Sequence, residues 1–312
     1  ILLAIGVTMV LSASFARAYF DPGGVTKGKA TYYFIRQFIF AALGVAAMII
    51  CSRLPVGFYK RFSMPVLIAA VILLMLVPII GTNANGAKRW IGLGAFTIQP
   101  SEIAKIGIIL AFASMICARR GRMKSFRYGI LPFAAILAAI VGLLVLEPHF
   151  SASIIIVAIG GVMLFLGGAR LVWFIAAAVA AGGGIAVLLT MFPYASTRIT
   201  TWRDPFASTS DEGYQIVQSL YSIGSGGLTG LGLGQSRQKY LYLPEEHNDY
   251  IFSIVCEELG YVGAIAILIL FALLICRGYW IAAHSPDRYS FLVGIGITTL
   301  LSIQVFLNIA VV

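Results

Sequence analysis

The stretch YIFSIVCEELGYVGAIAILILFALLIC, residues 250–276, decides the fold of this chain. It exceeds the roughly 20 apolar residues that an α-helix needs to cross the hydrocarbon core of a bilayer. No water reaches the backbone there, so each peptide group must find its hydrogen-bond partner within the segment. Helices meet this requirement, whereas membrane strands are shorter and alternate in polarity. The stretch therefore predicts a membrane-spanning helix.

Runs of the same kind recur along the whole chain. Of its 312 residues, 60% are hydrophobic and only 11% are charged, and the mean hydropathy is +0.96. Soluble proteins carry about 25% charged residues, so a water-soluble core is excluded. We predict an all-α polytopic membrane helix bundle, folded as a single domain over residues 1–312. The nine expected spans lie near residues 1–20, 33–52, 64–80, 102–118, 129–146, 151–168, 171–192, 250–276 and 291–312.

Lysine and arginine residues indicate the orientation. They gather in connections near 53–61, 119–127, 170 and 277–288, which share one side if the helices alternate. By the positive-inside rule that side is the cytoplasm. The net charge of +10 is then mainly an orientation signal with attraction to anionic lipid, and nucleic acid is not an expected partner. Only Asp287 of the twelve acidic residues falls on this side, so chemistry is expected outside.

Two outer connections are long enough to carry a function, at about 81–101 and 193–249. The second contains Tyr214, Val217 and Tyr221 at helical spacing, which predicts a short helix on the membrane surface. It ends in a run of polar residues, 245–249, directly before the apolar stretch. This polar run is the main candidate for a site.

Two blocks resemble the SEDS family, which includes FtsW, RodA and SpoVE. They are GAKRWIGLGAFTIQPSEIAK (86–105) and RDPFASTSDEGYQIVQSLYSIGSGGLTGLGLGQSRQKYLYLPEEHNDYIFSIVCEELGYVG (203–263). The similarity runs over the whole chain in order and favours the FtsW or SpoVE branch. One departure is His149, where the family more often has Asp, so no acidic role is carried over to that position.

The resemblance implies a ten-helix peptidoglycan glycosyltransferase that polymerises lipid II at the outer face of the bacterial cytoplasmic membrane. The chain starts and stops inside apolar runs, so we expect a segment trimmed at both ends that lacks the tenth helix. The family also implies a class B penicillin-binding protein as partner, together with membrane proteins of the divisome or elongasome. A lipid II flippase and a scaffold that recruits the penicillin-binding protein are the rival functions. The polar residues gather at the outer face, which favours the glycosyltransferase over the flippase. A flippase would need charged residues at many depths across the membrane interior.

Polymerisation requires a base for the acceptor hydroxyl and cations for the departing pyrophosphate. Asp249 lies at the membrane boundary, where partial burial would raise its pKa towards a useful range. From position alone, a helix N-cap formed by Asn248 or Asp249 is an equally good interpretation. The resemblance implies that Asp249 is the catalytic residue.

We predict that polar side chains of the two outer connections bind the substrate, together with two residues of the span that follows the first of these connections. An arginine can donate two parallel hydrogen bonds to phosphate oxygens, whereas a lysine acts as a point charge. A histidine can transfer protons. Surface charges and a structural ion pair between helix neighbours three residues apart are the alternatives. The predicted set is Arg89, Glu102, Lys105, Arg203, Arg237, Lys239, Glu245 and His247.

A divalent cation, Mg²⁺ or Mn²⁺, is the expected cofactor, and Glu245 would hold it or orient the acceptor sugar. We interpret Glu246 as part of a solvated acidic loop, and Glu257 and Glu258 as structural partners inside the bundle. No organic cofactor is expected, because the glycine-rich stretch 222–235 lacks the GxxxxGK[ST] pattern of nucleotide loops. We interpret that stretch as a mobile lid or cradle over the substrate diphosphate.

Overall fold

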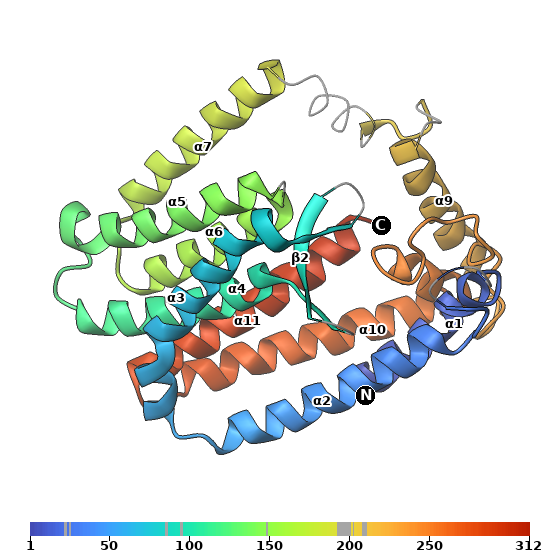
Figure 1. Cartoon of the computed structure of the whole chain (residues 1–312), viewed down its shortest axis with the longest axis horizontal. Helices are drawn as coiled ribbons and strands as arrows, with labels where there is room; N and C mark the ends of the chain where they lie inside the picture. The colour runs from blue at the N-terminus through green and yellow to red at the C-terminus, as the bar shows by residue number, and fades with distance from the viewer. Residues whose placement is uncertain are drawn as a thin grey trace. The chain divides into compact units, whose positions relative to one another are not determined.

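A computed structural model describes residues 1–21, 24, 26–84, 87–93, 96–147, 149–191, 201, 203–207 and 211–312. Every expected span coincides with a helix (Figure 1). These helices are α1 (Leu2–Tyr19), α2 (Tyr32–Arg53), α3 (Val56–Ile80), α4 (Pro100–Ala118), α5 (Leu131–Leu146), α6 (Phe150–Leu166), α7 (Leu171–Met191), α10 (Ile251–Ala283) and α11 (Arg288–Ala310). A short π-helix, η1 (Phe126–Ile130), leads into α5.

The helices confirm a multi-pass, all-α membrane fold, although the number of full-length spans differs from the expected nine. Seven helices in the described ranges are long and apolar enough to cross a membrane. Helix α6 has 17 residues, and the part of α7 whose side chains are described, 171–180, is shorter still. Both are apolar, so the difference lies in their length rather than in their composition.

The first outer connection folds as a small antiparallel sheet, which the sequence interpretation did not anticipate. Its strands are β1 (Thr82–Ala84), β2 (Ala87–Leu93) and β3 (Phe96–Ile98), in the order β1-β2-β3. Thr82 pairs with Trp90 across the first ladder, and Ile91 pairs with Ile98 across the second. Adjacent antiparallel strands need only short connections, so this compact segment satisfies its backbone by cross-strand pairing.

The second outer connection contains the predicted short helix. Helix α9 spans Asp211–Gly226 and presents Tyr214 and Tyr221 as exposed side chains. Its polar and apolar residues separate onto different faces, as in helices that lie along an interface. The chain then continues through a loop, 227–250, into α10.

Contacts divide the chain into two compact units. The first comprises Ile1–Arg53, Gly182–Leu274 and Val305–Val312, and the second comprises Leu54–Ala181 and Ile275–Gln304. In the first unit, α1 packs on α2, and Leu243, Tyr250 and Ile254 join Met9 in an apolar core. This core attaches the polar run before α10 to α1.

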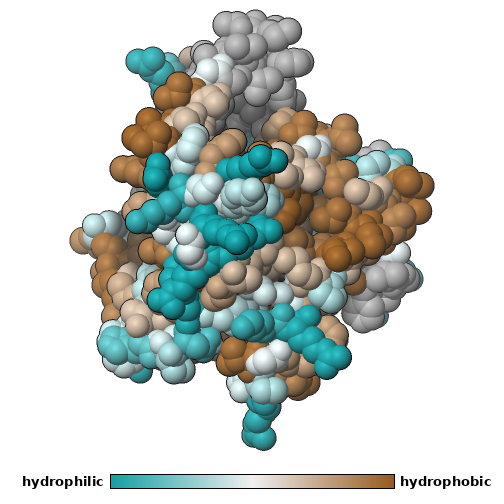
Figure 2. Space-filling model, turned by 90° about the vertical axis from the view of Figure 1, so that its left-hand side faces the viewer, coloured by the Kyte–Doolittle hydropathy of each residue, from teal (hydrophilic) through white to brown (hydrophobic). Residues whose placement is uncertain are grey.

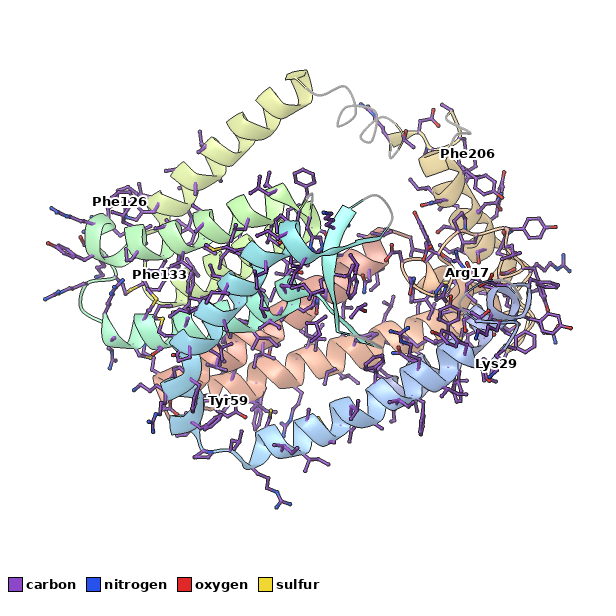
Figure 3. The ribbon with its side chains drawn as sticks, in the orientation of Figure 1. Arg17, Lys29, Tyr59, Phe126, Phe133 and Phe206 are labelled. Carbon is purple, nitrogen blue, oxygen red and sulfur yellow. The ribbon has the colours of Figure 1, made fainter. Side chains whose placement is uncertain are left out.

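In the second unit, α4 is the central helix and packs against α3 and α6. Buried residues make up 67% of its most apolar window, whereas the corresponding window of α3 is 28% buried. Phe112 of α4 meets Phe133 of α5 edge to face, with ring centres 4.9 Å apart (Figure 3). A central helix of this kind provides a fixed base for the polar residues at its two ends.

Candidate functional site

The polar run before α10 is held by an arginine from α1. Arg17 Nη2 lies 3.4 Å from Glu245 Oε1, and Arg17 Nη1 lies 3.3 Å from Glu246 Oε2 (Figure 3). Asn248 Nδ2 donates to the second oxygen of Glu245 at 2.8 Å. Glu245 has a φ of 53°, so the chain turns sharply at this residue. One guanidinium therefore fixes both glutamates of the turn.

Glu246 differs from its sequence interpretation. Its side chain is only 1% exposed, so it does not belong to a solvated acidic loop. Burial raises its pKa, while its own backbone N–H and Arg17 oppose this effect. Glu246 Oε1 is buried without a hydrogen-bond partner, which makes Arg17 its main stabilising contact among the described residues.

Asp249 belongs to the same turn, and its surface is partly exposed and partly covered by the surrounding residues. Its carboxylate makes no hydrogen bond or ion pair with any described residue. Desolvation by its surroundings raises its pKa, and the negative charge of Glu245 raises it further. A carboxylate with a raised pKa and open lone pairs is suited to accept a proton.

The alternative interpretation, in which Asn248 or Asp249 caps the N-terminus of α10, requires a side-chain hydrogen bond that the structure does not show among the described residues. Helix α10 begins at Ile251, yet the Asn248 side-chain amide donates to Glu245 instead. Neither Asn248 nor Asp249 accepts a side-chain hydrogen bond from the first turn of α10 within the described ranges. Within the described residues, the geometry thus gives neither Asn248 nor Asp249 a capping hydrogen bond.

His247 lies beside this turn and against Tyr33 of α2, with ring centres 4.6 Å apart. Burial lowers its pKa, and the positive charge of Arg17 lowers it further. The imidazole is therefore neutral at neutral pH, and its Nδ1 is buried without a hydrogen-bond partner. Its predicted contact with substrate stays a prediction.

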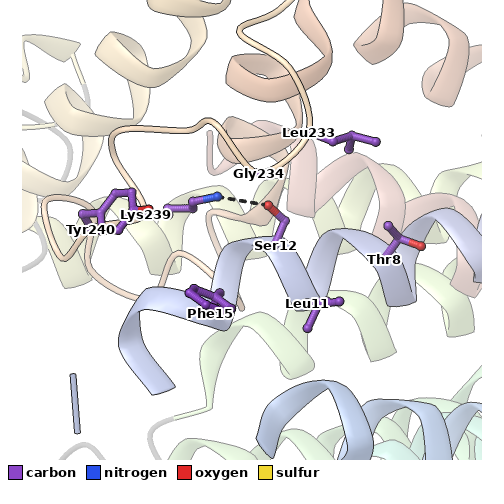
Figure 4. Close-up of a pocket in the computed structure, with 8 residues that line it drawn as sticks. All are labelled: Thr8, Leu11, Ser12, Phe15, Leu233, Gly234, Lys239 and Tyr240. Carbon is purple, nitrogen blue, oxygen red and sulfur yellow. Dashed lines mark hydrogen bonds between the residues drawn. The ribbon is translucent and has the colours of Figure 1, made fainter. Parts of the chain in front are cut away.

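Lys239 lines a pocket together with residues of α1, and its ammonium is bound in a network there (Figure 4). Its Nζ lies 3.0 Å from Glu258 Oε1 and 3.3 Å from Ser12 Oγ (Figure 4). Ser12 Oγ donates to both oxygens of Glu258 at 2.7 Å. Lys239 is 2% exposed and Glu258 1% exposed, so the Lys239 ammonium stabilises α10 against α1 in this structure.

Glu257 is also satisfied within the first unit, in agreement with the interpretation of both glutamates as structural partners. It accepts hydrogen bonds from Ser222 Oγ at 3.1 Å, from Ser236 Oγ at 2.5 Å and from the Arg237 main-chain N–H at 3.0 Å. The Arg237 side chain itself stays exposed. Arg203 is likewise exposed, so both guanidiniums are accessible to an anionic substrate.

The backbone of the glycine-rich stretch packs against α10, while its role as a mobile lid or cradle stays a prediction. Leu231 and Gly232 donate backbone hydrogen bonds of 3.0 Å to the carbonyls of Glu257 and Glu258. Gly260 has a φ of 67° and a ψ of −172°, which interrupts α10 and exposes these carbonyls to the loop. A Cβ on Gly230 would clash with the Glu258 carbonyl oxygen. The glycines therefore permit close backbone packing on the interruption of α10.

A second polar group lies in the second unit, around the start of α4. Lys105 Nζ contacts Glu102 Oε1 at 2.7 Å, which confirms the predicted pair on one helix face. Lys105 is 2% exposed, whereas 53% of the Glu102 side chain is exposed. Arg89 of β2 donates from Nε to the Glu147 carbonyl oxygen at 3.4 Å. The exposed glutamate is the member of this group that faces solvent.

Glu147 is a feature of this second group that sequence reasoning missed. It is 2% exposed, and neither carboxylate oxygen has a hydrogen-bond partner among the described residues. Burial raises its pKa to about 7, although Arg89 opposes this effect. Its position at the end of an apolar span was the available signal, because carboxylates at such depth are costly.

No three His, Cys, Asp or Glu side chains converge into a metal site in the described ranges. Asp249 and Glu245 are close enough to interact electrostatically. Mg²⁺ commonly binds one or two carboxylates and takes its other ligands from water and substrate phosphates. Glu245 is thus the carboxylate of this pair that suits a divalent cation shared with a diphosphate.

The chain is similar to known proteins over its full length. The family model for FtsW, RodA and SpoVE, described as cell cycle proteins, matches residues 1–312. Stage V sporulation protein E of Bacillus subtilis is 38% identical over 315 residues, which cover 100% of this chain and 84% of that protein. A probable peptidoglycan glycosyltransferase FtsW of Saccharophagus degradans is 38% identical, with 100% of this chain and 80% of that protein covered.

Solved structures give the same result. A chain from a peptidoglycan synthase complex, solved to study the coordination of polymerization and crosslinking, aligns with a TM-score of 0.76 and 28% identity over 98% of this chain and 86% of that chain. The rod shape determining protein RodA of Thermus thermophilus aligns with a TM-score of 0.66 and 25% identity over 99% and 82%. This chain therefore belongs to the cell cycle protein family of FtsW, RodA and SpoVE.

Proposed function

We propose that this protein is a peptidoglycan glycosyltransferase that joins lipid II units into glycan strands and releases polyprenyl pyrophosphate. Relatives that cover 99–100% of the chain carry the name probable peptidoglycan glycosyltransferase FtsW. The observation that carries the proposal in the structure is the Asp249 carboxylate, which is exposed, unpartnered among described residues and raised in pKa. These are the properties of a general base at a membrane boundary.

The reaction follows from the groups around Asp249. Its carboxylate accepts the proton of the acceptor sugar hydroxyl as that oxygen attacks the anomeric carbon of the donor. The bond from that carbon to the pyrophosphate breaks, and the pyrophosphate leaves with the electron pair. A single displacement of this kind inverts the anomeric carbon. The exposed guanidiniums of Arg203 and Arg237 are the cations that we assign to the departing diphosphate.

Two further groups complete the assignment. Glu245, together with the diphosphate oxygens, would hold a divalent cation, which would offset the diphosphate charge and leave Asp249 free as the base. Arg89, Glu102, Lys105 and His247 are the remaining side chains that we assign to substrate, with Lys105 acting through its ion pair to Glu102. Lys239 has a supporting role instead, since its ammonium is bound to Glu258.

Orientation and partners are part of the proposal. The positive-inside rule puts the polar run before α10 at the outer face of the bacterial cytoplasmic membrane. A similar chain belongs to a peptidoglycan synthase complex in which polymerization and crosslinking are coordinated. We infer a class B penicillin-binding protein as partner, within a divisome or an elongasome. Co-purification with the penicillin-binding protein of the same organism tests this partner.

The decisive experiment compares Asp249→Asn with the unaltered chain, using purified protein, labelled lipid II and a divalent cation. We expect normal lipid II binding and no glycan polymer, because the amide cannot accept the proton. Asp204→Asn is the matched control, since Asp204 is another exposed acid of the second outer connection. Full polymer yield from Asp249→Asn would refute the assignment. Loss of lipid II transport, with polymerisation intact, would favour the flippase.

A further inference from the structure

The connection between α4 and α5 concentrates positive charge. The stretch ARRGRMKSFRYG, residues 118–129, carries five cations and no acid. Within the described ranges, no carboxylate lies within 4.0 Å of any of these cations. Asp287, the acid that the sequence assigns to this side of the membrane, instead accepts hydrogen bonds from the Ser290 N–H and hydroxyl at 3.0 and 2.7 Å. The charge of this connection is thus uncompensated by the described part of the chain.

Three of the five cations line one cavity of about 350 Å³: Arg119, Arg122 and Arg127. Its opposite wall is apolar and consists of Leu131, Pro132 and Ala135 at the start of α5. A free inorganic anion would make no favourable contact with apolar side chains of this kind. A lipid, by contrast, presents a charged headgroup and an apolar chain together.

Aromatic rings hold the three guanidinium groups. The Tyr128 ring centre lies 5.9 Å from the guanidinium carbon of Arg122 and 6.0 Å from that of Arg127. The Phe133 ring centre lies 5.8 Å from the guanidinium carbon of Arg119. Contacts of this kind restrict the guanidiniums without using their N–H groups. The donors remain available for an anion.

Arg119 provides an independent sign of a missing acceptor. Its Nη1 is buried and has no hydrogen-bond partner. A buried charged donor without an acceptor is destabilising, because it has lost its hydrogen bonds to water and forms none within the protein. Arg119 lines the cavity, so a rotation of its guanidinium would bring this donor to a phosphate oxygen bound there.

The backbone around the cavity is already folded. The Arg122 N–H donates to the Arg119 carbonyl at 2.8 Å, and the Ser125 N–H donates to the Arg122 carbonyl at 3.1 Å. Met123 is 2% exposed and anchors the middle of the connection. Binding would therefore order little additional backbone, which favours affinity.

We propose that this cavity binds the phosphate headgroup of an anionic phospholipid at the membrane surface. The connection joins the ends of two membrane-spanning helices, so it lies where headgroups lie. Figure 2 shows a band of hydrophilic side chains bordered by hydrophobic ones on the end of the molecule to which Phe126, labelled in Figure 3, belongs. Tyr128 and Leu131 are 55% and 46% exposed, so the apolar wall is accessible to an acyl chain.

The test compares two double variants of the purified full chain. Arg122→Gln with Arg127→Gln removes two charges from the cavity, and Arg120→Gln with Lys124→Gln removes two from outside it on the same connection. Native mass spectrometry measures bound phosphatidylglycerol against phosphatidylcholine. We expect the cavity variant to bind phosphatidylglycerol about 10-fold more weakly than the control variant, since it loses charge-assisted hydrogen bonds as well as charge.

Equal weakening in the two double variants would overturn the proposal, because it would show a diffuse attraction of charge. Inorganic phosphate as a soluble competitor forms the second arm. Displacement of phosphatidylglycerol by inorganic phosphate at equal concentration would reveal a free-anion site and overturn the lipid assignment. If the variants do not fold, thermal unfolding of the unaltered chain with each lipid tests the site instead. Stabilisation against heat by phosphatidylglycerol and not by phosphatidylcholine supports the site, and equal stabilisation by both refutes it.

Discussion

Replacing Lys239 by Met is predicted to destabilise the protein strongly, because it leaves the buried Glu258 carboxylate without its cation. Lys239 and Glu258 are 2% and 1% exposed, so water does not screen their 3.0 Å contact. After the substitution only neutral donors remain, from Ser12 at 2.7 Å and from the Ser236 N–H at 3.3 Å. Removal of one partner from a buried ion pair costs about 3–5 kcal/mol.

This cost can be measured by thermal unfolding of the purified chain in detergent, followed by tryptophan fluorescence. With about 2–4 °C for each kcal/mol in a protein of this size class, the melting temperature should fall by about 6–20 °C. Lys29→Met is the matched control, since Lys29 is an exposed lysine of the same unit (Figure 3). We expect no measurable change for it.

The double variant Lys239→Met with Glu258→Met separates the lost pair from lost packing. It removes both charges, so it should recover most of the stability lost in the single variant. A single variant as stable as the Lys29→Met control would refute the reasoning. A double variant no more stable than Lys239→Met would show that packing rather than charge dominates.

Three further outcomes follow from the structure. If Asp249 is the base we propose, Arg17→Gln should lower polymerisation by about 10–100-fold, because the turn that carries Asp249 is misplaced. Lipid II binding should persist, and recovery of activity by Arg17→Lys would support positioning by charge. The raised pKa of Glu147 means that stability should fall as pH rises from 4.5 to about 7, since the folded state binds the proton more tightly; Glu147→Gln should flatten this dependence in thermal unfolding. Gly230→Ala should reduce the yield of folded protein, because its Cβ would meet the Glu258 carbonyl, whereas Gly224→Ala, with open space around its Cβ, should not.

The sequence predicted the elements close to membrane spans better than those between them. Runs of apolar residues identified every span, and helical spacing identified α9. The sheet at 82–98 was missed, although the Asn85-Gly86 dipeptide is a known hairpin signal. Nine helices lie at the nine expected spans, and seven of them are described over a length sufficient to cross a membrane.

The candidate site was predicted only in part, for a related reason. Asp249 and the Glu102–Lys105 pair were visible from local sequence, since a polar residue at a span boundary and a spacing of three residues are local properties. Arg17 was not visible as the partner of Glu245, which lies 228 positions away. Glu246 was misinterpreted, because its burial depends on packing against α1.

The sequence by itself determined which segments enter the membrane, because the cost of moving residues from water into lipid adds up along the chain and is recorded in composition. Tertiary structure alone decided which polar groups meet. Ser12 contacts Glu258 across 246 positions, and the loop before α10 contacts the interruption at Gly260 through backbone groups. Such contacts depend on distances in space, and no local pattern of residues encodes them.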